Sequence, residues 1–348
     1  MDSTVSELIE RVRKAAAEKR PLRIRGGSSK DFYAYKLEGD PLDVAGYRGV
    51  VDYEPSELVL TARAGTPLAE IEATLAKGGQ MLACEPPYFG PNATLGGCVA
   101  SGLSGPRRAS AGAVRDFVLG TRVLNGEGED LRFGGQVMKN VAGFDVSRLM
   151  AGSFGTLGVI LEISLKVLPT PEKEVTLRLA LDEAKAIEAM NRWAGRPLPI
   201  SATCYAEGAL SVRLSGSQLG VDAARARLGG DTVPDGAAFW RAVREQTLDG
   251  MHGSLWRLSV KPTTPPLGQR GTQVIEWNGS LRWIAADTPP QQVFELARKA
   301  NGHATRVRGG NGAPIMRLDP GVLGLHKRLK AALDPDGIFG PHRLHPDF

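Results

Sequence analysis

The feature that most constrains this chain is a 28-residue stretch, residues 86–113, which contains six glycines and only two charged side chains. A surface loop of this length is normally more polar and more highly charged. Small residues let the backbone pack closely and turn its amide groups toward a ligand, beside the hydroxyls of Thr94, Ser101 and Ser104. The stretch therefore predicts either a wall around a flat, polar, anionic ligand or a buried loop with a purely structural role.

Two further glycine-rich segments lie in the same half of the chain, where residues 26–160 hold 23 of the 43 glycines. The segment 25–30 (RGGSSK) follows a predicted strand and combines glycines with two cations and two serines, but it has neither the P-loop nor the G-x-G-x-x-G pattern. The segments 139–145 and 152–158 lead into a predicted strand over 159–168. Each segment alone is compatible with an ordinary turn, whereas all of them together favour one shared ligand.

Charge and cysteine content narrow the function classes. The net charge is +5, but the first 30 residues alone carry eight basic and four acidic side chains. A small anionic ligand therefore fits better than nucleic acid.

The three cysteines lack the close spacing of a metal or iron–sulfur site, and they indicate a reducing compartment. Without an apolar leader or an 18-residue apolar run, we expect a cytoplasmic protein with no direct membrane insertion.

The length of 348 residues suggests two domains. Pro169 and Pro171 disfavour a continuing helix or central strand, so we place the first boundary there, giving 1–171, 172–320 and 321–348. Hairpins with interspersed helices indicate an α+β fold built on antiparallel sheets. The predicted helices are 4–18, 66–77, 182–194, 221–228, 236–248, 289–300 and 321–333. The predicted strands are 21–25, 50–53, 58–62, 118–124, 130–133, 159–168, 174–180, a pair around 207–208, 254–260, 274–277, 281–285 and 303–308.

Three segments together carry a family resemblance: 86–113 with its PRR, VMKNVAGFD (137–145) and GSFGTLGVI (152–160). They resemble the PCMH-type FAD-binding domain of the vanillyl-alcohol-oxidase-like flavoproteins, and within that family the FAD-binding E subunits of bacterial glycolate oxidase. The resemblance covers about residues 20–170 and resumes at 329–340. It implies a two-part FAD-binding domain over 1–171, a smaller α+β cap domain with an antiparallel sheet over 172–320, and a C-terminal helix and tail, 321–348, that return to the FAD domain.

The resemblance also implies which residues contact FAD. Residues in the first loop would hold the pyrophosphate, those in the second would line the pyrophosphate, flavin and ribityl chain, and those in the third would hold the adenosine half. The implied residues are Arg25, Gly26, Gly27, Ser28, Ser29, Lys30, Thr94, Gly96, Gly97, Ser101, Gly102, Ser110, Gly112, Asp116, Gly152, Ser153, Gly155, Gly158, Val159 and Ile160.

The sequence departs from the family in its histidines. Many members tether the flavin through a histidine in the first loop, where this chain has Ser28 and Ser29, so we expect non-covalent FAD and regard Cys98 as a small buried residue. Members that oxidise 2-hydroxy acids carry a cluster of histidines in the cap, which is missing here, so we expect no metal and name no catalytic base. The histidines are His252, His303, His326, His342 and His345. Candidate clamps for a substrate carboxylate are Arg107, Arg108, Arg257 and Arg317, although Arg107 and Arg108 equally suit a phosphate contact or a structural ion pair.

We therefore expect a non-covalent FAD-binding subunit of a complex that oxidises glycolate, a small 2-hydroxy acid, to glyoxylate. The resemblance implies two partners, a sister FAD-binding subunit and an iron–sulfur subunit, and any attachment to the inner membrane would be made through them. Two alternatives stay open. One is a self-sufficient FAD-dependent 2-hydroxy-acid or alcohol dehydrogenase, and the other is a redox-inactive FAD- or nucleotide-binding scaffold.

Overall fold

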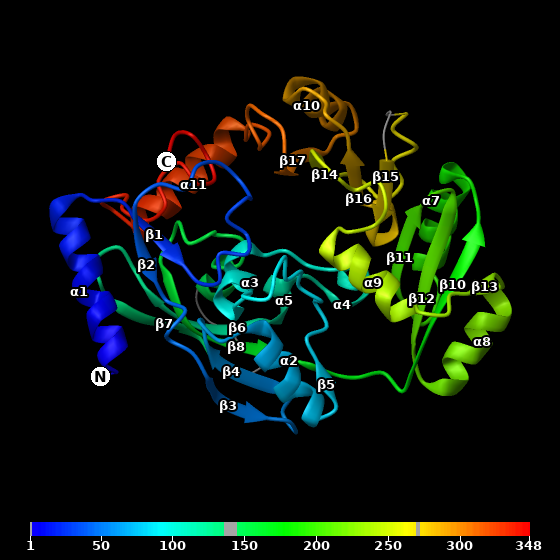
Figure 1. Cartoon of the computed structure of the whole chain (residues 1–348), viewed down its shortest axis with the longest axis horizontal. Helices are drawn as coiled ribbons and strands as arrows, with labels where there is room; N and C mark the ends of the chain where they lie inside the picture. The colour runs from blue at the N-terminus through cyan, green and yellow to red at the C-terminus, as the bar shows by residue number, and fades with distance from the viewer. Residues whose placement is uncertain (1, 136–144, 269–271) are drawn as a thin grey trace.

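Two antiparallel sheets organise the molecule, one built from the first half of the chain and one from the second (Figure 1). The computed structural model describes residues 2–135, 145–268 and 272–348. The motif residues 139–144 therefore lie outside the described residues. None of the helices that the structure describes is long and apolar enough to cross a membrane.

The first sheet has the strand order β3-β4-β8-β6-β7. Its strands are β3 (Val50–Glu54), β4 (Val59–Arg63), β6 (Val118–Leu124), β7 (Asp130–Gly134) and β8 (Val159–Lys166). β8 is central and buries six of its eight residues, all except Glu162 and Lys166. A short pair, β5 (Gln80–Met81) with β9 (Leu168–Pro169), continues this half.

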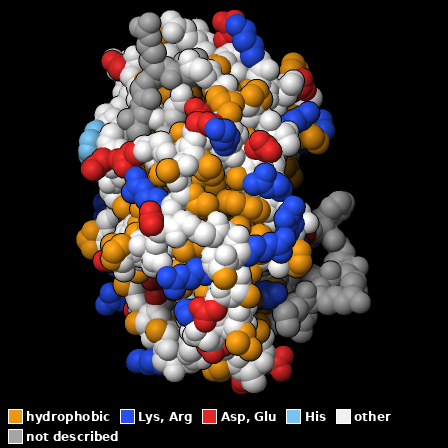
Figure 2. Space-filling view, turned by 90° about the vertical axis from the view of Figure 1, so that its right-hand side faces the viewer, with side chains coloured by type: hydrophobic (Ala, Val, Ile, Leu, Met, Phe, Trp, Pro, Cys, Tyr) orange, Lys and Arg blue, Asp and Glu red, His pale blue; other side chains and the backbone are white. Residues whose placement is uncertain are grey.

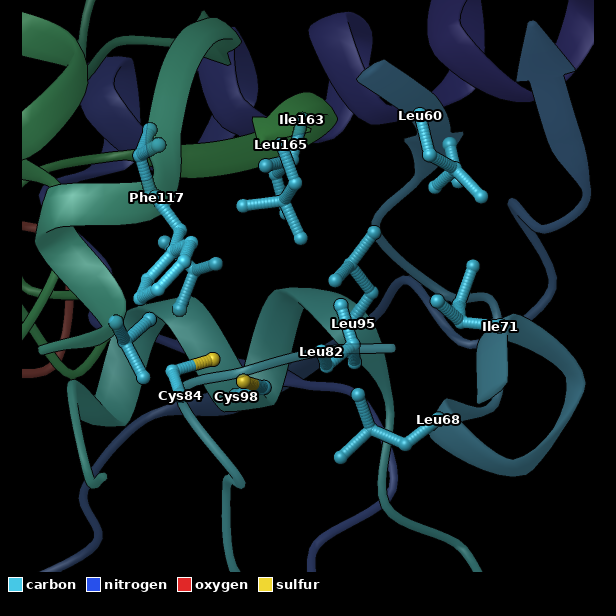
Figure 3. Close-up of a cluster of buried hydrophobic side chains, with 14 of the residues drawn as sticks. Leu60, Leu68, Ile71, Leu82, Cys84, Leu95, Cys98, Phe117, Ile163 and Leu165 are labelled. Atoms are coloured by element: carbon cyan, nitrogen blue, oxygen red, sulfur yellow. The ribbon is translucent and has the colours of Figure 1, made fainter. Parts of the chain in front are cut away.

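Helices cover both faces of this sheet. On one side, α2 (Leu68–Lys77) and α3 (Leu95–Ser101) pack over the main core shown in Figure 3, to which α2 contributes Leu68, Ile71 and Leu75 at helical spacing. Two short helices, α4 (Arg108–Ala111) and α5 (Val114–Phe117), follow α3. On the other side, α1 (Ser3–Glu18) packs with the parallel pair β1 (Leu22–Arg25) and β2 (Asp40–Asp43).

The second sheet has the order β13-β10-β12-β11-β15-β16-β14-β17. Its strands are β10 (Lys173–Ala180), β11 (Ile200–Ala206), β12 (Ala209–Gly216), β13 (Asp231–Thr232), β14 (Leu255–Ser259), β15 (Thr272–Glu276), β16 (Leu281–Ala285) and β17 (His303–Arg308). Its helices are α7 (Glu183–Ala194), α8 (Gln218–Leu228), α9 (Gly236–Glu245) and α10 (Pro290–Lys299). Figure 2 looks onto the side that carries α7 and α8, where hydrophobic side chains gather in the middle of the face.

The C-terminal segment returns to the first half of the chain. After α11 (Pro320–Leu333), Leu22 donates its amide to the carbonyl of Ile338 at 2.6 Å, and Gly340 donates to the carbonyl of Leu22 at 2.9 Å. Lys330 lies under this segment, with Nζ 2.6 Å from Asp334 Oδ2 and 2.6 Å from the Phe339 carbonyl. The tail thus forms an edge beside β1 and the loop that follows it.

The predicted α+β class with antiparallel sheets is confirmed. Three predicted pairs of consecutive strands form, β6 with β7, β11 with β12 around residues 207–208, and β15 with β16, although Trp277 belongs to the connecting turn and not to the strand. The interpretation of 86–113 as loop was incomplete, because α3 and α4 form within it, and the strand β2 was missed. The boundary after 171 falls between β9 and β10, and the boundary after 320 falls one residue inside α11. The division into three domains stays a prediction.

Candidate functional site

A cleft with about 930 Å³ of empty space, partly open to solvent, lies where the first glycine loop meets α3 and the C-terminal tail. Its walls come from residues 23–31 and 36–38, from residues 94–101, from the turn before β8 and from the tail. Segments more than 300 residues apart in sequence therefore share one site. Backbone and small side chains form most of its surface.

The first loop approaches the segment before α3 so closely that side chains are excluded. A Cβ added to Gly27 would lie 1.5 Å from the Asn92 carbonyl oxygen, and one added to Gly26 would lie 2.6 Å from Thr94 Oγ1. Ser28 adopts a φ of 55°, in the left-handed region that few side chains favour. The amides of Gly27 and Ser28 donate to no atom in the described part of the chain. They are therefore available to an anion in the cleft.

Three cations line the cleft without a carboxylate partner among the described residues: Arg23, Lys30 and Arg343. Lys30 is buried, with Nζ 3.2 Å from Ser29 Oγ and 3.3 Å from the Tyr88 carbonyl, and burial lowers its pKa. Arg343 is also buried, donates to the carbonyl of Lys30 at 3.2 Å, and burial lowers its pKa. The Nε of Arg23 is buried without a partner. Buried cations held by neutral groups leave a positive potential that an anionic ligand would satisfy.

The cleft is lined by fewer acidic than basic side chains. Asp31 and Glu38 line the same cleft, and Glu38 pairs with Lys36 at 3.7 Å. The four cations that line the cleft, Arg23, Lys30, Lys36 and Arg343, outnumber these two carboxylates, so the lining carries a net positive charge.

The structure brings most of the predicted cofactor residues to this cleft. Those that line it are Gly26, Gly27, Ser28, Ser29, Lys30, Thr94, Gly96, Gly97, Ser101, Gly155, Gly158 and Ile160. Those outside its lining are Arg25, Gly102, Ser110, Gly112, Asp116, Gly152, Ser153 and Val159.

Several residues outside the lining have evident local roles. Arg25 is exposed and pairs with Asp43 at 2.8 Å, so it points away from the cleft. Ser110 donates from Oγ to the Ser201 carbonyl at 2.8 Å, which ties α4 to the second sheet. Asp116 accepts from the Ala113 amide at 2.8 Å in the turn after Gly112.

The remaining residues outside the lining are buried or in close backbone contact. Gly102 and Gly152 bring their backbones into contact, since a Cβ on Gly102 would lie 3.0 Å from the Gly152 amide nitrogen. Val159 is completely buried in β8. Ser153 Oγ is buried without a partner among the described residues.

Sequence reasoning missed Arg23, Phe154, Gly340 and Arg343. Phe154 stacks on Tyr33 with ring centroids 5.0 Å apart, and the Arg343 guanidinium lies 5.9 Å from the centre of the Phe154 ring. A signal existed for the tail, because the resemblance resumed at 329–340 and so predicted its return. The resemblance ends before Arg343, which reaches the cleft only through the three-dimensional fold of the chain.

The two arginines of the PRR motif have different surroundings. Arg107 is buried and contacts Glu85 at 3.3 Å and Glu174 at 2.8 Å, so of the three roles left open for it the structure shows the ion pair. Arg108 lies over the ring of Trp277 at 4.3 Å, without an ion pair to a described residue. Arg317, another candidate clamp, is exposed.

The folded cleft and its glycine loop define a flavoprotein with an FAD-binding domain, and a family model described as "FAD binding domain" matches residues 3–134. The solved structure of an alkyldihydroxyacetonephosphate synthase superimposes with a TM-score of 0.70 at 16% identity, covering 97% of this chain and 75% of that one, which shows a shared fold.

The glycolate oxidase subunit GlcE of Escherichia coli (strain K12) is 48% identical over 98% of this chain and 97% of its own length. The chain belongs to the family of that subunit. More distantly, the glycolate oxidase subunit GlcD of Bacillus subtilis is 43% identical over 26% of this chain and 19% of its own length. A D-lactate dehydrogenase of Anaerostipes hadrus is 34% identical over 37% of this chain and 26% of its own length.

FAD is the cofactor of this fold, and the residues present fit it. The diphosphate of a dinucleotide needs close backbone approach and cationic neutralisation. The cleft offers the first through Gly26 and Gly27 and the second through Lys30 and Arg343. Its apolar wall, with Ile160 and Phe154, suits planar rings.

Proposed function

We propose that this chain is a non-covalent FAD-binding subunit of a glycolate oxidase, which oxidises glycolate to glyoxylate and passes electrons to partner subunits. The observation that carries the proposal is the cleft itself, in which the buried cations Lys30 and Arg343 lie within or beside the glycine loop and have no carboxylate partner among the described residues. The near full-length match to a subunit named for glycolate oxidase supports the substrate.

Within the cleft, this chain's residues bind and orient the cofactor. Lys30 and Arg343 would neutralise the diphosphate, and the amides of Gly27 and Ser28 would donate to its oxygens. When bound, FAD supplies an acceptor for the hydride that leaves the carbon of a hydroxy acid. The protein contributes position, exclusion of water and charge.

Non-covalent attachment follows from the nucleophiles near the cleft. The first loop holds serines and no histidine. Cys98 is 2% exposed, lies in the core of the first half beside Cys84 (Figure 3), and burial raises its pKa to about 12. A thiol that is protonated and directed into the core is a poor tether.

The electrons that this chain passes on need an acceptor in a partner subunit. Cys84, Cys98 and Cys204 are all buried and come from separate elements, so they do not provide ligands for an iron–sulfur cluster. The family resemblance implies an iron–sulfur subunit as the onward carrier and a sister flavin subunit as the main site of oxidation, and we propose both as partners of this chain. A cytoplasmic complex, attached to the inner membrane only through partners, is consistent with this arrangement.

The test begins with the visible spectrum of the purified chain before and after denaturation. Flavin bands whose chromophore is released on denaturation support the proposal, whereas retained chromophore contradicts non-covalent binding. Lys30→Met is expected to weaken FAD binding by tenfold or more, while Arg25→Met, in the same loop but outside the cleft, changes it less than threefold. Equal effects of the two substitutions on FAD binding would contradict the assignment of the cleft as the FAD site.

Glycolate oxidation is then measured with an artificial electron acceptor, using the chain alone and the chain with its two partners. We expect little turnover by the chain alone and restoration by the partners. Rapid turnover alone would favour the second candidate, a self-sufficient dehydrogenase. Failure to take up FAD would leave the scaffold hypothesis.

A further inference from the structure

A short loop, residues 86–90, lies between the first glycine loop and the second half of the chain. On one side, its Tyr88 carbonyl accepts a hydrogen bond from Lys30 Nζ at 3.3 Å. A Cβ added to Gly90 would lie 4.0 Å from the Cβ of Ser29, which is ordinary van der Waals contact. The loop therefore contacts two residues that line the cleft, Ser29 and Lys30.

Glu245, the last residue of α9, holds this loop from the other side. Its Oε2 accepts hydrogen bonds from two consecutive backbone amides, that of Tyr88 at 3.1 Å and that of Phe89 at 2.8 Å. Its Oε1 accepts from Arg244 Nε at 2.8 Å and lies 3.2 Å from the Tyr88 amide nitrogen. Successive amides that point at one anion form a concave anion site. Here a carboxylate from the second half of the chain occupies it.

The backbone at this contact has a conformation that the carboxylate helps to hold. Phe89 has a φ of 52°, in the left-handed region that few side chains favour. Hydrogen bonds from amides to a carboxylate are stronger than those to a neutral acceptor. Only 18% of the Glu245 side chain is exposed, so water competes little for these bonds. Loss of Glu245 should therefore release the loop.

Lys30 depends on this loop for its position. Among the described residues its Nζ donates to two oxygens, Ser29 Oγ and the Tyr88 carbonyl, so the loop supplies one of the two acceptors. The centre of the Phe89 ring lies 5.6 Å from the same Nζ, within reach of a cation–π contact. Burial lowers the pKa of Lys30, and the Glu245 carboxylate opposes that shift. Glu245 thus supports both the place and the charge of the ammonium group.

We propose that Glu245 is a positioning residue for the cofactor site. It fixes the backbone of Tyr88 and Phe89, and through the Tyr88 carbonyl it sets the place of the Lys30 ammonium in the cleft. The second half of the chain thereby acts on a cation of the first half, although Glu245 does not itself line the cleft. The inference rests on the proposed function only in taking Lys30 as the cation that meets the diphosphate.

The first test needs no cofactor. Lysines of the FAD-free full chain are labelled with an N-hydroxysuccinimide ester, and the rate at each lysine is followed by mass spectrometry. Glu245→Leu should raise the rate at Lys30 at least fivefold, because the loop and its carbonyl acceptor move away. Lys330 is the internal reference, since it is 6% exposed and held by Asp334 in a different part of the molecule, and its rate should not change. Glu188→Leu, at an exposed position on α7, should leave both rates unaltered.

Glu245→Gln separates hydrogen bonding from charge. An amide oxygen in the place of Oε2 still accepts from both loop amides, whereas the negative charge is lost. Labelling of Lys30 should therefore rise less than twofold in this variant. A rise as large as that in Glu245→Leu would assign the effect to charge and overturn the positioning role. Equal acceleration at Lys30 and Lys330 would assign Glu245 to overall stability and would overturn it as well.

FAD affinity gives the second test, through a double-mutant cycle with Lys30. Glu245→Leu should weaken FAD binding at least fivefold in the otherwise unaltered chain, but less than twofold in Lys30→Met, because the effect passes through Lys30. Equal losses in the two backgrounds would contradict the proposal. Tighter FAD binding by Glu245→Leu would also contradict it, since that result is expected if the carboxylate only repels the diphosphate.

The proposal and the proposed function fail in different ways. If the chain takes up no FAD, the proposed function fails, and the lysine labelling still decides whether Glu245 positions Lys30. If FAD binds but Glu245→Leu leaves the labelling of Lys30 unchanged, the positioning role is wrong and the proposed function stands.

Discussion

The Arg107 guanidinium joins the two halves of the chain, with its Nη2 2.8 Å from Oε2 of Glu174 on β10. The same side chain contacts Glu85, which Arg213 of β12 also holds at 2.8 Å. A carboxylate between two buried guanidiniums therefore links the glycine-rich stretch to the second sheet.

Removing one guanidinium from this cluster should destabilise the protein strongly. Arg213 is 3% exposed, and Arg213→Met would leave Glu85 buried with less compensation. We expect the free energy of unfolding in urea to fall by about 3 kcal/mol. Arg132→Met is the control, because Arg132 is exposed and its ion pair with Glu162 is long, at 3.7 Å. This substitution should lower the free energy of unfolding by less than about 1 kcal/mol. Similar losses for the two variants would contradict the cluster's role.

The same cluster should make stability depend on acid pH. Burial alone would raise the pKa of Glu85, but Arg213 and Arg107 outweigh it and hold the net pKa below its ordinary value. A carboxyl with a lowered folded pKa stabilises the protein above its unfolded pKa of about 4.3, and this contribution is lost as the pH falls through the folded value. The contribution of Glu85 to the urea midpoint should therefore be constant from pH 7 to 5 and be lost below pH 4.5.

Glu85→Gln provides the check on that pH dependence. The variant should be less stable at pH 7 and should lose less stability on acidification than the unaltered chain. A parallel decline of both proteins would assign the acid sensitivity to other carboxylates, such as Asp130, whose pKa the hydrogen bond from Arg122 lowers.

The sequence predicted the antiparallel class and both hairpins because alternation and Asn-Gly turns are local signals. Asn125–Gly126 and Asn278–Gly279 each lie between the paired strands. It also identified the glycine loops, because close backbone approach excludes side chains, as Gly27 illustrates. The helix α3 was hidden because Gly96, Gly97 and Ser101 are poor helix formers, and its helix depends on the Thr94 cap and on packing.

What the sequence could not show is pairing across long separations. Arg343 meets Lys30 at a separation of 313 residues, and Arg107 meets Glu174 across the junction. No local sequence pattern predicts either contact. The cleft is of the same kind, because its walls come from segments between Arg23 and Arg343 that no periodicity connects.

Gly27→Ala should disrupt the first loop. The added Cβ would lie 1.5 Å from the Asn92 carbonyl oxygen, so the loop must move away from the segment before α3. We expect FAD affinity to fall at least tenfold, measured by fluorescence titration of the apoprotein. Gly46→Ala is the control, since nothing lies within 4 Å of its Cβ position. Unchanged affinity in Gly27→Ala would show that the loop does not contact the cofactor.

The C-terminal tail should control cofactor affinity through Lys330. Its Nζ holds Asp334, the Thr156 carbonyl and the Phe339 carbonyl, all within 2.8 Å, and so fixes the segment that carries Gly340 and Arg343 into the cleft. Lys330→Met would leave Asp334, which is 1% exposed, without its cation.

We therefore expect Lys330→Met to lower the free energy of unfolding by about 3 kcal/mol and to weaken FAD binding by tenfold or more. Lys327→Met, on the exposed side of the same helix, removes only a surface pair with Asp347 and should alter both quantities little. Loss of stability with normal FAD affinity in folded Lys330→Met would show that the tail supports the fold without shaping the cleft. A matched loss of both places Arg343 in the cofactor site, because Lys330 itself does not line the cleft and acts on it only through the tail.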